Sequence, residues 1–206
     1  MKEIIGFHGT KNICAGSIVS DNFKVATKRK NDNHWLGHGI YFYADYELAE
    51  WWANTKVKVH NEKYNQNDKA SVIKAKISAQ NILDLDNPFM LNKFECYCEE
   101  LEREIVEQGI VLNFAIGDNV KDCKNIVQQR ERCFWMDCVK ENKNIDVIIY
   151  TFSKRDPAYA ASKYHISKLG RLGLFYNEKQ ICVTDCNSIK ERTIVGNDLS
   201  LDEVIV

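Results

Sequence analysis

Apolar residues recur along this chain at two different periods, and the changes between them predict strands and helices in an irregular order. Short apolar or alternating runs, typical of strands, cover residues 4–7, 40–44, 72–78, 82–85, 145–152, 172–176 and 180–184. The polar residues His8, Gly9 and Thr10 directly follow the first run and indicate a turn at the end of that strand. In the run at 72–78, Lys74 and Lys76 share one face, so we expect that face of the sheet to be exposed to solvent.

Helical periodicity appears in three longer segments, each with a residue suited to start it. Asp45 can cap the first helix. The apolar side of this helix is formed by Leu48, Ala49, Trp52 and Ala53. Asn87 and Pro88 open the second, with Gly109 past its end, and Asp118 can cap the third. The second and third helices form an insertion, at about residues 87–140, between predicted strands.

The order of these elements favours a single α+β domain that covers residues 1–206. Strands come first, helices are inserted, and strands come last, without the regular alternation of a doubly wound parallel sheet. The chain has two prolines and ten glycines and no Ser/Gly/Pro-rich linker that would mark a domain boundary. No GxGxxG, GxxxxGK or GxSxG motif is present, which disfavours the usual phosphate-cradling loops and a serine triad.

Composition and charge narrow the class of protein only slightly. The net charge of -1 over 206 residues gives no overall electrostatic reason to bind nucleic acid or an anionic membrane. No apolar run approaches the roughly 20 residues of a membrane span, and the amino-terminal segment lacks the apolar stretch of a secretory signal. We therefore expect a cytoplasmic protein without a membrane partner.

The eight cysteines are expected to be reduced thiols in such a compartment. Zinc is the rival interpretation, but the closest cysteines occur as CYC, CFWMDC and CVTDC rather than as CxxC pairs. No histidines stand at zinc-finger spacing. We therefore expect no metal.

Three short motifs occur in order along the chain: FHGT at residues 7–10, GHGIYF at 37–42, and QICV at 180–183 after LFYNEK. Together they resemble the ADP-ribosyltransferases of the diphtheria-toxin and poly(ADP-ribose) polymerase type, whose signature is His, Tyr and usually Glu. The chain is most similar to small bacterial proteins with an HG[ST] start, a G-x-G-[IF]-Y core and a terminal QIC strand. The resemblance spans residues 8–185 and leaves the inserted helices unmatched.

The resemblance implies a split β-sheet core that holds NAD in a bent form across the cleft between two sheets. His8 would hydrogen-bond the adenosine ribose, and Gly9 would offer backbone groups to the nicotinamide amide. The alternative for His8 is a strand-end histidine that only satisfies a turn. The full set implied for NAD binding is His8, Gly9, Thr10, Gly39, Tyr41, Tyr43 and Trp52.

Aromatic residues of the second motif and of the following helix would form the walls of the NAD site. Tyr41 matches the motif tyrosine, which packs on nicotinamide and its ribose, and Tyr43 shares its strand face at period two. Trp52, or alternatively Trp51, would supply the second wall. His34 and His38 receive no role.

The third catalytic position departs from the pattern of the polymerases. Gln180 stands where they carry glutamate, and a glutamine offers neither a full negative charge nor a general base. Glu178 lies two residues earlier, on the same face if the strand extends that far, and could orient or activate an acceptor. Its alternative is a solvated hairpin charge beside Asn177. The catalytic candidates are therefore His8, Tyr41, Gln180 and Glu178.

The expected function is mono-ADP-ribosyl transfer from NAD to a macromolecular acceptor, either protein or nucleic acid. Basic residues at 24–30 and 163–171 could follow a phosphate backbone, although ordinary surface lysines explain them equally well. The alternatives are an NAD glycohydrolase, a catalytically weak NAD- or ADP-ribose-binding module, and an RNA phosphotransferase. The resemblance also implies a bacterial or phage toxin or defence effector with an inhibitory antitoxin partner.

Overall fold

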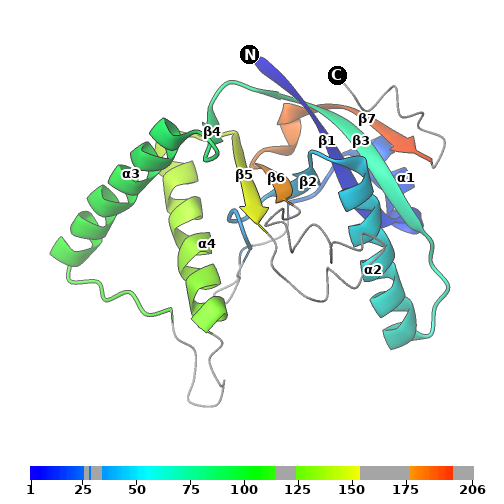
Figure 1. The fold of residues 1–206 in the computed structure, drawn as a ribbon, viewed down its shortest axis with the longest axis horizontal. Coiled ribbons are helices and arrows are strands. Elements are labelled where there is room, and N and C mark those ends of the chain that lie inside the picture. Colours follow the sequence, from blue (N-terminus) through cyan, green and yellow to red (C-terminus); the bar gives the residue numbers. More distant parts are fainter. Residues whose placement is uncertain (26–27, 29–33, 115–123, 154–176, 197–206) are drawn as a thin grey trace, which may run out of the picture.

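A computed structural model describes residues 1–25, 28, 34–114, 124–153 and 177–196. Within these ranges the strands are β1 Lys2–Lys11, β2 Ile40–Tyr43, β3 Ala70–Ala79, β4 Ile82–Asp84, β5 Val147–Ser153, β6 Asn177–Val183 and β7 Ile189–Val195. The helices are α1 Asn12–Asp21, α2 Tyr46–Tyr64, α3 Pro88–Glu107 and α4 Lys124–Lys143. The α+β class is confirmed (Figure 1). The predicted strand at 172–176 and the predicted cap Asp118 lie outside the described residues.

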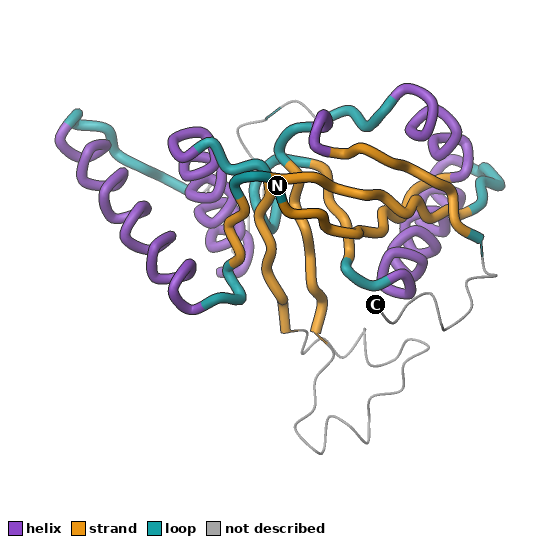
Figure 2. Tube along the Cα trace, turned by 90° about the horizontal axis from the view of Figure 1, so that it is seen from above, coloured by secondary structure: helices purple, strands orange, loops and turns teal. Residues whose placement is uncertain are grey.

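The strands form one mixed sheet in the order β4-β5-β6-β2-β1-β3-β7. The β4–β5 pair is parallel, and the other pairs are antiparallel. β1 pairs with β3 along its whole length, whereas its register with β2 consists of the single pair Phe7–Tyr43. The sheet is therefore almost divided between β1 and β2. The strands of the two parts also run in different directions (Figure 2).

The prediction of a turn at residues 8–10 is wrong, because β1 continues to Lys11. His8 pairs with Ile73 and Gly9 with Val72, so β3 holds the polar residues in extended conformation. Local sequence contains no sign of this pairing, since β3 begins about sixty residues later. His8 consequently lies inside a strand and beside the division of the sheet.

Helices cover both faces of the part formed by β1, β3 and β7. Val72 belongs to a buried cluster with Leu48 and Ala49 of α2, and the next residue, Ile73, belongs to one with Ala15 of α1. Because adjacent strand residues point to opposite faces, α1 and α2 lie on opposite sides of the sheet. Asp45 caps α2 as predicted, accepting the Glu47 and Leu48 N–H groups.

The inserted helices α3 and α4 pack together beside β4 and β5, at the other side of the molecule from α1 and α2 (Figure 1). Their bounds match the predicted insertion closely. Asn87 accepts the Phe89 N–H group as the predicted cap of α3. Leu83, Met136, Val139 and Ile148 are buried between this hairpin and the sheet. This packing fixes α4 against the edge of the site described next.

Candidate functional site

A cavity of about 430 Å³ lies where the two parts of the sheet separate. Its volume is within the range of small-molecule sites. Its lining includes His8 and Gly9 of β1, Tyr41 and Tyr43 of β2, Trp52 of α2, and Glu178 and Gln180 of β6. The structure thus brings together seven of the nine predicted site residues, from β1, from the adjacent elements β2 and α2, and from the distant strand β6.

His8 bridges the separating strands with its side chain. Its Nδ1 lies 2.8 Å from the Tyr41 carbonyl oxygen, which can only accept, so Nδ1–H donates. Burial lowers the pKa of the imidazole below its ordinary value of 6.5, although the bond to Tyr41 opposes this shift. The neutral tautomer with a proton on Nδ1 has an acceptor at Nε2. His8 therefore links β1 to β2 where backbone pairing ends, and it keeps one nitrogen suited to a hydroxyl group.

Gly9 allows α2 to lie directly on β1. A Cβ atom at this position would be 2.2 Å from the Ala49 carbonyl oxygen, which is closer than any real contact. The close approach brings Trp52, one turn after Ala49, to the cavity. Helix packing therefore already requires the glycine, whatever the cavity binds.

Thr10 and Gly39, which the resemblance implied for NAD binding, do not line this cavity. Thr10 lines a neighbouring groove along α2. A Cβ at Gly39 would lie 2.5 Å from Cys182 Sγ and 2.6 Å from the Val183 carbonyl oxygen. Close contact with β6 thus explains this glycine.

Tyr41 uses its hydroxyl group within the protein and presents its ring to the cavity. The hydroxyl donates to the Gly37 carbonyl oxygen at 2.6 Å and accepts the Leu36 N–H at 2.7 Å. Burial, reinforced by the neighbouring Cys182 thiol, raises the pKa of the phenol. The hydroxyl therefore stays neutral, and its two hydrogen bonds stabilise the turn before β2. Tyr43 lines the cavity beside Tyr41, as expected from period two.

Trp52, rather than Trp51, faces the cavity. Its side chain is 36% exposed, and its ring centroid lies 6.5 Å from that of Tyr43. Trp51 packs against the cluster that contains Phe7 and Leu48. The Lys56 ammonium lies 4.3 Å from the Trp52 ring centroid, within cation–π range. An aromatic wall and a positive charge therefore adjoin at this side of the cavity.

Glu178 and Gln180 form a buried pair on β6. They are 2% and 7% exposed, and Gln180 Nε2 donates to Glu178 Oε1 at 2.6 Å. The alternative of a solvated hairpin charge for Glu178 is therefore wrong, since β6 extends back to Asn177. The cavity thus has a carboxyl group whose orientation is set by a neighbouring amide.

Sequence reasoning missed five other lining residues: His34, Trp35, Phe42, Lys56 and Gln129. His34 stacks obliquely near Tyr41, with ring centroids 6.2 Å apart. Lys56 follows Trp52 by four residues, a helical spacing that could have indicated it. Gln129 comes from α4 and reaches the cavity through tertiary packing, for which the local sequence carries no signal.

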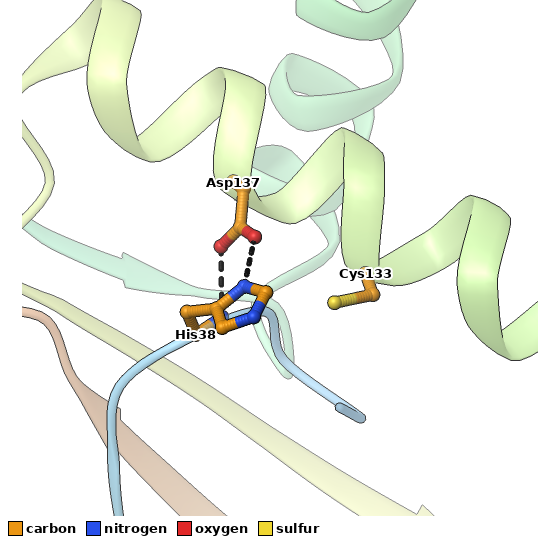
Figure 3. Close-up of side chains that lie close together, drawn as sticks. All are labelled: His38, Cys133 and Asp137. Atoms are coloured by element: carbon orange, nitrogen blue, oxygen red, sulfur yellow. Dashed lines mark hydrogen bonds and ion pairs between the residues drawn. The ribbon is translucent and has the colours of Figure 1, made fainter. Parts of the chain in front are cut away.

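A second polar cluster joins α4 to the turn before β2 (Figure 3). His38, Cys133 and Asp137 place donor atoms within 4.8 Å of one another, a set that zinc could use. However, Asp137 already accepts the His38 N–H at 2.8 Å, faces His38 Nδ1 at 2.5 Å, and pairs with Lys140 at 2.9 Å. Because the Lys140 ammonium already supplies a positive charge there, we interpret the cluster as a structural network.

The structure describes only part of the two predicted basic segments. Lys28, from the basic segment 24–30, pairs with Glu141, and residues 163–171 lie outside the described ranges. The seven cysteines in the described part of the chain are free thiols. Among the helices that the structure describes, none combines the length and apolar character of a membrane span.

Comparisons of the chain with protein-family models, with curated proteins and with solved structures give no match. The cavity and the motif residues that line it are therefore the features that bear on function.

Proposed function

We propose that this protein is a mono-ADP-ribosyltransferase that uses NAD as its co-substrate. The observation that carries the proposal is the convergence of His8, Tyr41 and Glu178 on one cavity at the division of the sheet. His8 and Tyr41 come from the first two motifs that resemble the ADP-ribosyltransferases, and Glu178 lies two residues before Gln180, which begins the third. The split between β1 and β2 supports the finer proposal of an ADP-ribosyltransferase-like fold, with NAD held between the two parts of the sheet.

Each lining group suits one part of NAD. The Nε2 atom of neutral His8 would accept a ribose hydroxyl hydrogen, while Nδ1 remains bonded to β2. The rings of Tyr41, Tyr43 and Trp52 would pack on the planar nicotinamide and hold it in an apolar setting. The site thus combines one hydrogen-bonding anchor with aromatic walls, which is typical of sites for flat, polar-edged ligands.

The buried pair on β6 would supply the electrostatic part of catalysis. When the bond between nicotinamide and ribose breaks, nicotinamide leaves with the electron pair and positive charge develops on the ribose. The Glu178 carboxylate would stabilise this charge, and Gln180 would hold the carboxylate in place through its Nε2–H bond. An acceptor nucleophile then attacks the anomeric carbon and releases a proton. No step requires a metal.

Incubation with NAD labelled in the ADP-ribose part, with nicotinamide release measured in parallel, tests the proposal. We expect Glu178→Gln to lower nicotinamide release about a hundredfold or more, a loss comparable to that on removal of one hydrogen-bond donor that stabilises transition-state charge. His8→Ala should also abolish release. Glu191→Gln, on the exposed surface of β7, is the matched control and should be unaffected.

The outcomes separate the proposal from its alternatives. Full turnover by both His8→Ala and Glu178→Gln would place the reaction elsewhere and reject the site. Nicotinamide release without labelled macromolecule would identify an NAD glycohydrolase. Calorimetric NAD binding without release would identify a binding module, the alternative that glutamine at position 180 favours. Label on a macromolecule supports transfer.

A further inference from the structure

A second groove, of about 380 Å³, follows the carboxyl-terminal half of α2 and the end of β1. Gly9 and Lys56 line both this groove and the candidate cavity, so the two adjoin. The linings of the groove and the cavity include Trp52, Lys56, Val59, His60 and Lys63 of α2. The spacing of these five residues, four, three, one and three, keeps them on one face of the helix. Val57 and Tyr64 of α2 also line the groove. A surface track therefore leads along α2 into the cavity.

Lysines and exposed rings alternate along this track. Lys56 lies 4.3 Å from the Trp52 ring centroid, and Lys63 lies 5.0 Å from that of Tyr64, which is 55% exposed. His60 adds a ring 4.8 Å from Tyr64.

The charge balance of the groove is positive. Lys11, Lys56 and Lys63 line it. The acid at this end, Asp68, lies 3.7 Å from both Lys11 and His60 and offsets one of these charges. The remaining lysines make the groove suitable for an anionic ligand.

We propose that this groove binds single-stranded nucleic acid. Non-specific single-strand sites combine a positively charged path for the backbone with aromatic rings on which bases stack. Trp52 and Tyr64 are about 18 Å apart along the helix axis, roughly five stacked nucleotides. An acidic peptide would satisfy the lysines but would leave the exposed Tyr64 ring without a planar ligand.

A nucleic-acid strand in the groove would make a nucleotide the acceptor of ADP-ribose. This part of the inference rests on the proposed function. A strand bound along α2 places one nucleotide at Trp52, at the entrance of the cavity. A nucleophilic atom of that nucleotide attacks the anomeric carbon of NAD, nicotinamide leaves with the C–N electron pair, and the nucleophile's proton goes to solvent.

Fluorescence anisotropy with a labelled twelve-nucleotide strand tests the groove without NAD. Arms with deoxythymidine and uridine oligomers separate DNA from RNA as the source of the strand. We expect Tyr64→Ala to weaken binding about tenfold, the size of one lost stacking contact. Lys63→Gln should reduce the slope of log affinity against log salt by about 0.7, for one lost phosphate contact. Neither residue lines the NAD cavity.

Lys58→Gln is the matched control, since Lys58 is on the same helix but off the groove face. It should leave affinity within about twofold. Absence of oligonucleotide binding by the wild-type protein, or equal weakening by Lys58→Gln and Lys63→Gln, would overturn the inference. Label from NAD that resists nuclease and is removed by protease would overturn the acceptor class.

Because binding is measured without NAD, it tests the groove even if nicotinamide release is absent. Conversely, Tyr64→Ala should release nicotinamide from NAD alone at the wild-type rate.

Discussion

Asp137→Asn removes the negative charge at the centre of the network that holds the turn before β2 against α4. The substitution preserves the size and planarity of the side chain. In the wild-type protein Asp137 accepts the His38 N–H at 2.8 Å, and its other oxygen faces His38 Nδ1. The Lys140 ammonium, 2.9 Å away, has a side chain only 2% exposed and also donates to the His38 carbonyl oxygen. The variant therefore leaves a buried cation without its counter-ion.

Removing one partner of a buried ion pair costs about 3–5 kcal/mol, because the remaining charge stays desolvated. The Asp137 side chain is 13% exposed, so water screens the pair slightly and the lower end applies, about 3 kcal/mol. For a chain of this size, that loss lowers the Tm by about 6–12 °C. Urea unfolding followed by far-UV circular dichroism measures the free energy directly.

The loss of stability caused by Asp137→Asn should become smaller in acidic solution. Burial alone would raise the pKa of the Asp137 carboxyl, but the charge of Lys140 and the bonds from His38 outweigh it and lower the pKa below 3.8. A lowered pKa means that the stabilisation is fully present above the unfolded value, near pH 4, and is lost as pH falls through the folded value. The difference in unfolding free energy between wild type and variant should therefore be constant near pH 6–7 and shrink below about pH 4.

Glu100→Gln provides the comparison within the same helical hairpin. Glu100 pairs with Lys143 at 3.8 Å on the surface, with side chains 54% and 35% exposed. Exposed pairs contribute less than about 1 kcal/mol. If Asp137→Asn costs no more than Glu100→Gln at pH 7, the network does not hold the turn and the reasoning from burial is refuted.

Two further substitutions and one pH titration test the site. Gly9→Ala should destabilise the protein by about 1–3 kcal/mol in thermal unfolding, because its Cβ collides with the backbone of α2; an unchanged Tm would contradict the packing argument. Tyr41→Phe should cost about 1–3 kcal/mol, since the Leu36 N–H loses its acceptor, yet it should keep nicotinamide release within about tenfold because the ring remains. Nicotinamide release should stay level from pH 8 to 6.5 and decline only in more acidic solution, because burial lowers the pKa of His8; a decline centred above pH 6.5 would argue against a neutral imidazole.

Local signals explain which elements the sequence predicts well. Asp45 and Asn87 begin α2 and α3 because their side chains accept N–H groups within the next three residues. The alternation at residues 72–78 lies within β3. The turn expected at residues 8–10 is wrong because ten residues of β3 keep β1 extended. Helix α1 and strand β7 were not predicted.

The residues of the candidate site also divide into those that local sequence identifies and those that only tertiary packing brings to the cavity. His8, Tyr41 and Trp52 are identified by motifs, which record local sequence, and the fold brings them to one cavity. Gln129 depends on the approach of α4, which no local pattern describes. Gly39 belongs to the second motif, but it lies against β6 and is not among the residues that line this cavity.

The register of β6 separates the roles of its two polar residues. Gln180 lies between Tyr43 of β2 and Tyr150 of β5, so strands flank it on both sides. Glu178 pairs with Phe152 of β5 but lies beyond the last residue of β2, where the sheet opens toward the cavity. Both residues line the cavity, and the amide of Gln180 donates to the Glu178 carboxyl group, as a second carboxylate could not. The glutamine at the motif position is therefore consistent with catalysis, because the charge stands two residues earlier on the same face.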